Sequence, residues 1–219
     1  MSKKMMVLAL AVVGAAFFAL PAMASAETAH VSAATSFSIA SSTTGNLTST
    51  EGGSISCTST TGTGTFSTTT GGSASLILHG CSSVFLPCTS AGQSSGTIAA
   101  SASFDLITVS NGSAGILLTP IGPEEVTGQK VFSEFSCSGF TVKTFGPGVI
   151  GTLSSTVCGS STSTATLSFV STSAGHQSDK SLTGGTFDLS SDLTKSHPTA
   201  SLDGTATLNL SAARTFICT

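Results

Sequence analysis

The stretch from Cys137 to Cys158, CSGFTVKTFGPGVIGTLSSTVC, constrains the fold most, because it has the pattern of a β-hairpin with a cysteine at each end. Gly146-Pro147-Gly148 is its candidate turn. With Pro147 and Gly148 as the loop, Cys137 lies opposite Cys158 in a non-hydrogen-bonded pair, whose Cα spacing of about 4.5 Å suits a disulfide. A three-residue loop would instead shift the register by one residue. We predict a Cys137–Cys158 disulfide, contributing about 3 kcal/mol to stability.

Residues 1–26 have the pattern of a secretory signal peptide. A positively charged start (MSKK) precedes an apolar run over residues 5–20, and an A-x-A cleavage sequence ends at Ala26. The apolar run is nearly long enough for an uncleaved membrane anchor, but Pro21 followed by small residues favours cleavage. We therefore expect a secreted or extracytoplasmic protein, cleaved after Ala26, with no membrane span in the mature chain.

All the cysteines of the chain follow this leader: Cys57, Cys81, Cys88, Cys137, Cys158 and Cys218. An even number in an exported chain predicts three disulfides, for which fifteen connectivities exist. Beside Cys137–Cys158, a Cys81–Cys88 bridge would close a local loop and leave Cys57 for Cys218, although Cys57 lies almost equally well opposite Cys88. No C-x-x-C or C-x-x-H pair is present, so we do not expect cysteine-bound metal.

Charge is sparse and mildly acidic. Five of the seven basic residues follow residue 26, against ten acidic residues, and the chain has neither tryptophan nor tyrosine. Nucleic-acid binding needs a basic patch and stacking aromatic rings, and binding to anionic lipid needs a polybasic segment. We therefore expect neither nucleic acid nor a membrane surface as a partner.

Alternating apolar residues along the mature chain predict strand after strand. Serine and threonine occupy the intervening positions, where β-branched threonine suits a pleated sheet. Asn111-Gly112 is the strongest hairpin signal, and Gly71-Gly72, Gly184-Gly185 and Asp203-Gly204 are further candidate turns. No helical periodicity is sustained. The pattern predicts an all-β fold, an antiparallel β-sandwich or barrel-like domain built from hairpins and stapled by disulfides.

The length favours one all-β domain over residues 27–219. Residues 119–129, TPIGPEEVTGQ, form the most polar and proline-rich break in the chain. The alternative is two small β-sandwiches divided near 111–129.

One segment matches a catalytic motif. Gly92-Gln93-Ser94-Ser95-Gly96 fits G-x-S-x-G, the nucleophile elbow of α/β-hydrolases. That motif requires a strand before the serine and a helix after it, whereas an alternating strand pattern follows Ser94. Turn chemistry is the better interpretation, and a secreted hydrolase using Ser94 is kept as an alternative function.

The other ionisable residues form no convincing site. The histidines, at positions 30, 79, 176 and 197, have neither metal-ligand nor triad spacing. We interpret His176 with Asp179, and His197 with Asp192, as surface pairs, and His30 as part of a flexible N-terminus. We therefore predict no catalytic residue, no metal ligand and no cofactor.

The segments EGGSISCTSTTGTGTFS, HGCSS with PCTSAGQSSGTI, and FSCSGFTV with GPGVIGTL resemble a family of uncharacterised secreted bacterial proteins that are rich in Ser and Thr and contain disulfides. The resemblance covers most of the mature chain. Its motifs are cysteine and turn positions, so it implies export and disulfides and no activity.

These observations favour a non-catalytic exported protein with a structural or interaction role at the cell surface, in the envelope or in adhesion. Its expected partners are cell-envelope or extracellular proteins or glycans. Besides a hydrolase, the alternative is a ligand-binding β-barrel, which a continuous apolar cavity would support.

Overall fold

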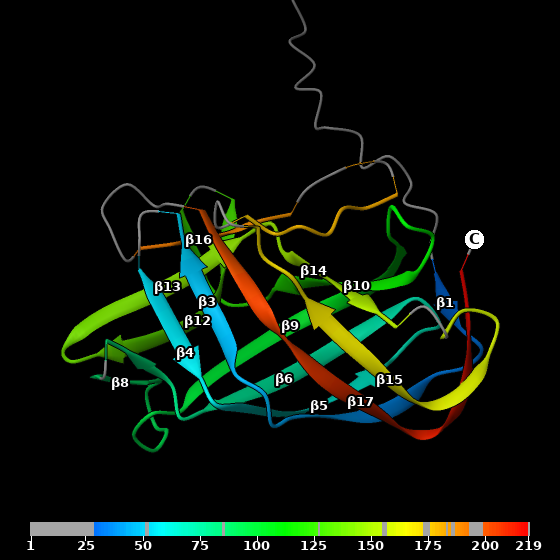
Figure 1. Cartoon of the computed structure of the whole chain (residues 1–219), viewed down its shortest axis with the longest axis horizontal. Coiled ribbons are helices and arrows are strands. Elements are labelled where there is room, and N and C mark those ends of the chain that lie inside the picture. Colours follow the sequence, from blue (N-terminus) through cyan, green and yellow to red (C-terminus); the bar gives the residue numbers. More distant parts are fainter. Residues whose placement is uncertain are drawn as a thin grey trace, which may run out of the picture.

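The computed structural model consists of seventeen β-strands, paired antiparallel, with no α-helix among the residues that it describes (Figure 1). This confirms the predicted all-β fold class. Over the same residues, no helix is both long and apolar enough to cross a membrane. The predicted signal peptide, residues 1–26, lies outside the described residues, which are 29–50, 53–84, 86–126, 128–154, 157–172, 176–182, 184, 187–192 and 199–218.

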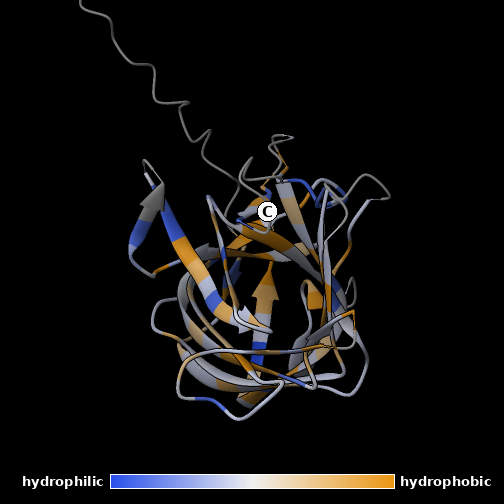
Figure 2. Ribbon diagram, turned by 90° about the vertical axis from the view of Figure 1, so that its left-hand side faces the viewer, coloured by the Kyte–Doolittle hydropathy of each residue, from blue (hydrophilic) through white to orange (hydrophobic). Residues whose placement is uncertain are grey.

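Eight strands pair in a closed antiparallel circuit, which we call the main circuit. In order around it, they are β2 (Thr35–Ser41), β5 (Ser59–Phe66), β6 (Gly71–His79), β9 (Ile98–Thr108), β10 (Ala114–Pro120), β14 (Val149–Leu153), β15 (Ser161–Phe169) and β17 (Thr199–Ile217). β17 pairs again with β2 and closes the circuit. Figure 2 shows the strands arranged around the interior, with apolar and polar residues following one another along them.

The first part of β17 belongs to a second circuit. Its other members, in order, are β3 (Gly45–Ser49), β4 (Ser54–Cys57), β7 (Ser82–Ser83), β8 (Leu86–Thr89), β12 (Gln129–Cys137), β13 (Phe140–Gly146) and β16 (Leu189–Ser191). In addition, β1 (His30–Val31) pairs with the end of β17, and β11 (Glu124–Val126) pairs with β12. The two circuits share β17, which crosses the molecule diagonally in Figure 1.

Strand pairing also connects the segments on either side of residues 111–129. β12 pairs with both β8 and β9, and β17 pairs with β2. The division of residues 27–219 into one domain rather than two stays a prediction.

The Asn111-Gly112 hairpin is confirmed. β9 and β10 pair with Thr108 opposite Ala114, and Gly112 has a φ of +80° in the turn. Asn111 Oδ1 accepts a hydrogen bond from the Ser113 backbone N–H over 2.9 Å. By contrast, the predicted turns at Gly71-Gly72 and Asp203-Gly204 are wrong, because these residues lie within β6 and β17.

The predicted hairpin over residues 137–158 is wrong. β13 pairs with β12 and β16, whereas β14 pairs with β10 and β15. The hairpin in this region turns at Ser138-Gly139, where both residues have positive φ, +53° and +90°. Such a turn matches the twist of paired strands better than a Pro-Gly turn does. The chain at Gly146–Gly148 instead passes from the second circuit into the main one.

The six cysteines all form disulfides, but the predicted pairs are wrong. Residues that strand pairing brings together are joined instead. The observed bridges are Cys57–Cys81, Cys88–Cys137 and Cys158–Cys218, with Cα separations of 4.0, 4.2 and 5.6 Å. Cys137 lies opposite Cys88 in the β8–β12 pair. Cys158 forms an isolated β-bridge with Phe216, two residues before Cys218. Three disulfides are typical of proteins from oxidising compartments.

The buried side chains form two main clusters. In the larger one, four phenylalanine rings pack together, and we call these the aromatic cluster: Phe37, Phe66, Phe104 and Phe216. The smaller one, which we call the cysteine cluster, surrounds two disulfides and consists of Ile55, Cys57, Cys81, Cys88, Ile98, Phe135, Cys137 and Val142.

Candidate ligand-binding cavity

An apolar cavity lies inside the strands, between the aromatic cluster and the cysteine cluster. Phe37 and Phe104 line it at one end, and Ile55, Ile98 and Phe135 line it at the other. Its volume is about 120 Å³, whereas close-packed protein interiors contain few voids larger than a water molecule. The lining is almost wholly apolar. Such a cavity suits an apolar guest, because water in it would lack hydrogen-bond partners.

Small side chains at inward strand positions keep this cavity open. Along β9, Ala100 lines it between Ile98 and Phe104. Ala74 of β6 and Ala206 of β17 line it as well. A leucine at any of these alanines would add three carbon atoms pointing into the interior. The cavity therefore follows from the side chains chosen for these positions.

One buried pair of hydroxyl groups lies in the apolar lining, whereas the hydrogen-bonded Ser41–Thr43 hydroxyl pair of the lining is exposed. Ser133 Oγ and Thr144 Oγ1 are 2.8 Å apart and hydrogen-bonded, and the two residues are only 8% and 1% exposed. β12 has an irregularity between Val131 and Ser133, so that Phe132 and Ser133 both line the cavity although they are consecutive. A β-bulge of this kind re-aims a side chain, here a hydroxyl, toward the interior.

The cavity reaches the surface at an opening along β17. The first part of β17 pairs with β3 as far as Asp203, and β17 pairs with β2 only from Thr207 onward. An interval of β17 that pairs with neither strand lies between these two points. Residues 42–44 span the interval, where Thr43 Oγ1 donates a hydrogen bond to the Thr205 carbonyl oxygen over 3.1 Å. Thr43, Asp203 and Thr205 are exposed and also line the cavity, so this interval is its rim.

The lining carries almost no charge. Asp203 at the rim is the one ionisable residue among the described lining residues, and its Oδ2 accepts a hydrogen bond from Ser171 Oγ over 3.2 Å. No lysine, arginine or histidine is part of that lining. A buried anion would therefore have no counter-charge within the cavity.

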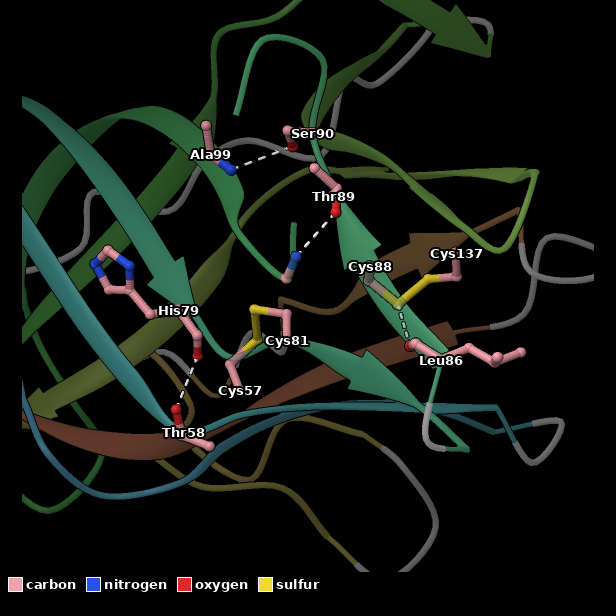
Figure 3. The surroundings of a disulfide bond; sticks show 11 residues. Cys57, Thr58, His79, Cys81, Leu86, Cys88, Thr89, Ser90, Ala99 and Cys137 are labelled. Atoms are coloured by element: carbon pink, nitrogen blue, oxygen red, sulfur yellow. Dashed lines mark hydrogen bonds between the residues drawn. A yellow bond between two sulfur atoms is a disulfide. The ribbon is translucent and has the colours of Figure 1, made fainter. Parts of the chain in front are cut away.

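Disulfides support the wall at the cysteine cluster, where Cys57 is the one cysteine among the described lining residues. Cys57 lines the cavity and is bonded to Cys81, whose backbone N–H donates to the Gly96 carbonyl oxygen over 2.7 Å. The Cys88 N–H donates to the Cys81 carbonyl oxygen over 2.9 Å. Figure 3 shows the two bridges, Cys57–Cys81 and Cys88–Cys137, on neighbouring strands. The wall is thus cross-linked both covalently and through the backbone.

Ser94 lies apart from this cavity, in an exposed turn between β8 and β9. The Thr97 N–H donates to the Ser94 carbonyl oxygen over 3.0 Å, and β9 begins at the next residue. The strand–turn–helix context of a nucleophile elbow is not present there. Among the described residues, no hydrogen bond joins the Ser94 side chain to a histidine or an acid.

The predicted partner of His176 is wrong. Its Nδ1 lies 3.0 Å from Asp188 Oδ2, and Asp188 Oδ1 accepts the Gln177 N–H over 2.7 Å, so Asp188 rather than Asp179 faces the imidazole. His79 Nε2 lies 2.8 Å from Thr61 Oγ1. His30 belongs to β1, opposite Ile217, rather than to a flexible terminus.

The remaining ionisable residues form no cluster with an evident chemistry. His197 lies outside the described residues, so its predicted pair with Asp192 cannot be placed. No group of three His, Cys, Asp or Glu residues in the described part of the chain could hold a metal ion. Burial raises the pKa of the Asp179 carboxyl above its ordinary value, and the nearby Thr152 hydroxyl offsets part of that rise. Neither Asp179 Oδ2 nor Thr152 Oγ1 makes a hydrogen bond of normal geometry among those residues.

Comparison with protein families, curated proteins and solved structures finds no match for this chain.

Inspection of the sequence did not identify the cavity-lining residues. The only signal for them was a run of small residues at alternate positions of one strand, with a large residue before and after the run. Ala100 and Ala102 form such a run between Ile98 and Phe104. That signal becomes specific only when β9 is placed beside β6, with Ala74 opposite Ala102.

Proposed function

We propose that this protein is an exported, non-catalytic binding protein that holds a small apolar molecule in its interior cavity. The observation that carries the proposal is the 120 Å³ apolar space between the two hydrophobic clusters, with a rim at the surface. An unfilled cavity of that size costs about 3 kcal/mol of folding free energy, at roughly 24 cal/mol per Å³. An apolar ligand would recover that loss and gain the burial of its own surface.

A direct test is isothermal titration calorimetry of the purified, oxidised protein with benzene, an uncharged apolar molecule small enough for a cavity of about 120 Å³. We expect saturable binding of one benzene per chain. Ala100→Leu should abolish it, because the added atoms project into the cavity. Ser101→Leu is the matched control, since Ser101 is the next residue on β9 and is exposed.

Circular dichroism of both variants would verify that the fold is retained. Binding that is absent in the unsubstituted protein, or undiminished in folded Ala100→Leu, would contradict the proposal.

A second candidate function is contact with another macromolecule of the cell surface or envelope. It is supported by three exposed apolar side chains at turns of the second circuit: Val84, Leu86 and Phe140, which are 83%, 48% and 78% exposed. The β7–β8 and β12–β13 turns that carry them are linked through Cys88–Cys137. Phe140→Ser should reduce retention of the protein by envelope fractions in a pull-down. Equal retention of both forms would remove this candidate.

A further inference from the structure

From the chemistry of the lining we infer that the cavity selects an uncharged apolar molecule with one hydroxyl or carbonyl oxygen, held by the Ser133–Thr144 pair. The inference rests on the proposed binding function and specifies its ligand. Three features lead to it: the charge of the lining, the position of the hydroxyl pair and its unused hydrogen-bonding capacity.

The charge of the lining disfavours ionic ligands. A carboxylate moved from water into an apolar cavity loses its hydration, and this loss is offset only by a paired charge and hydrogen bonds. The described lining contains no basic residue that could supply such a pair. An ammonium group would find Asp203 alone, which is exposed at the rim and already accepts a hydrogen bond from Ser171. A neutral guest avoids both costs.

The hydroxyl pair lies where three strands meet. Ser133 is opposite Thr144 on β13 and opposite Ala100 on β9. Ala100 is one of the residues whose small side chain leaves the cavity open, so the hydroxyl pair and the empty space adjoin. The irregularity in β12 brings Ser133 into the lining beside Phe132. A regular strand would place only one of these two consecutive residues on the inner face.

The pair retains hydrogen-bonding capacity. Each hydroxyl has one donor proton and two acceptor lone pairs. The bond between Ser133 and Thr144 uses one proton and one lone pair, and the described residues provide neither hydroxyl with a further partner. The second proton can be donated to a ligand oxygen, and the free lone pairs can accept a ligand hydroxyl. An alcohol satisfies both possibilities, and a ketone or ester satisfies the first.

The test compares ligands that share one phenyl ring and differ in the polar group. Benzyl alcohol, benzoate and benzylammonium would each be titrated into the oxidised protein near pH 7. We expect benzyl alcohol to bind with a dissociation constant about 10-fold or more below those of the two ions, because only the ions carry an unpaired charge into the cavity.

A double substitution tests the role of the hydroxyl pair. Ser133→Ala with Thr144→Val removes both hydroxyls together and leaves neither unpaired. We expect benzyl alcohol affinity to fall about 5-fold, the scale of one hydrogen bond, while affinity for benzene, which lacks an oxygen, is retained. The matched control is Ser136→Ala with Thr141→Val, a cross-strand pair on the same two strands that does not line the cavity.

The outcomes separate the two proposals. Benzene binding together with benzoate affinity equal to or above that of benzyl alcohol would overturn the selection of a neutral ligand and leave the binding function standing. Benzyl alcohol binding by the Ser133/Thr144 variant that is as tight as binding by the control variant would also overturn the selection alone. Failure of benzene and of every phenyl ligand to bind would overturn the binding function and this inference with it.

Discussion

The two ends of the molecule are closed by different means. At the aromatic end, Phe66 packs against Phe37, Phe104 and Phe216 with ring centroids 5.2, 4.9 and 6.3 Å apart. At the cysteine end, β4, β7 and β8 have only four, two and four residues. Two disulfides join these short strands to one another and to β12.

The difference reflects how much apolar surface each end can bury. The strands that carry the aromatic cluster are long, such as β9 with eleven residues, and bring large side chains together across many backbone hydrogen bonds. Short strands have few ladder bonds and few inward positions, so covalent links replace part of the missing burial. The cavity lies between, where alanines leave space that neither rings nor disulfides fill.

The largest expected effect comes from removing the links at the cysteine end. Replacing the four cysteines of Cys57–Cys81 and Cys88–Cys137 by alanine should lower the free energy of unfolding by about 6 kcal/mol, near 3 kcal/mol for each bridge. Urea denaturation measures the loss. Hydrogen exchange should accelerate in β4, β8 and β12 more than in β5 and β6, because the aromatic end keeps its packing.

Removing the third disulfide, Cys158–Cys218, is the control, since it ties the end of β17 rather than the short strands. It should not accelerate exchange in β4 and β8. Equal acceleration of hydrogen exchange at both ends in the four-alanine variant would show that the disulfides stabilise the two ends equally.

The next effect concerns the aromatic end. Phe66→Ala should cost about 4 kcal/mol, because Phe66 is fully buried and contacts three other rings. Urea denaturation of the oxidised protein measures it. Phe140→Ala is the matched control, and at 78% exposure Phe140 should change stability by no more than about 0.5 kcal/mol. A cost for Phe66→Ala similar to that of the control would contradict the proposed dependence on ring packing.

The smallest effect involves Asp179, which belongs to neither end cluster. Because burial raises its folded pKa above the unfolded value, the folded state binds the proton more tightly. Its contribution to stability is therefore lost as pH rises from about 4 through the folded pKa. Asp179→Asn removes this dependence and should flatten the decline of the urea midpoint between about pH 4 and pH 7. An unchanged slope would show that Asp179 does not titrate in this way.

The sequence alone was sufficient for the fold class and for one hairpin, but not for the predicted turns at 71–72, 146–148 and 203–204. Alternation of apolar residues with serine and threonine predicts strands, because successive side chains of a strand point to opposite faces. Asn111-Gly112 predicts its hairpin because such a dipeptide tolerates the positive φ of a tight turn, and of the two residues only Gly112 adopts it. The even number of cysteines predicts that all are paired, and they are.

The tertiary structure decided which strands pair, and with them the disulfides and the cavity. Gly146-Pro147-Gly148 has turn chemistry, but the two strands beside it find longer partners elsewhere, β13 with β12 and β14 with β10. The cysteines follow those partners, because a disulfide requires Cα atoms a few ångströms apart. The cavity depends on residues from several strands, such as Ala74, Ala100 and Ala206, that are distant in the chain and meet only inside the closed circuit. Local sequence patterns carry no information on contacts between distant residues. Those contacts depend on which long-range strand pairs bury the most apolar surface together.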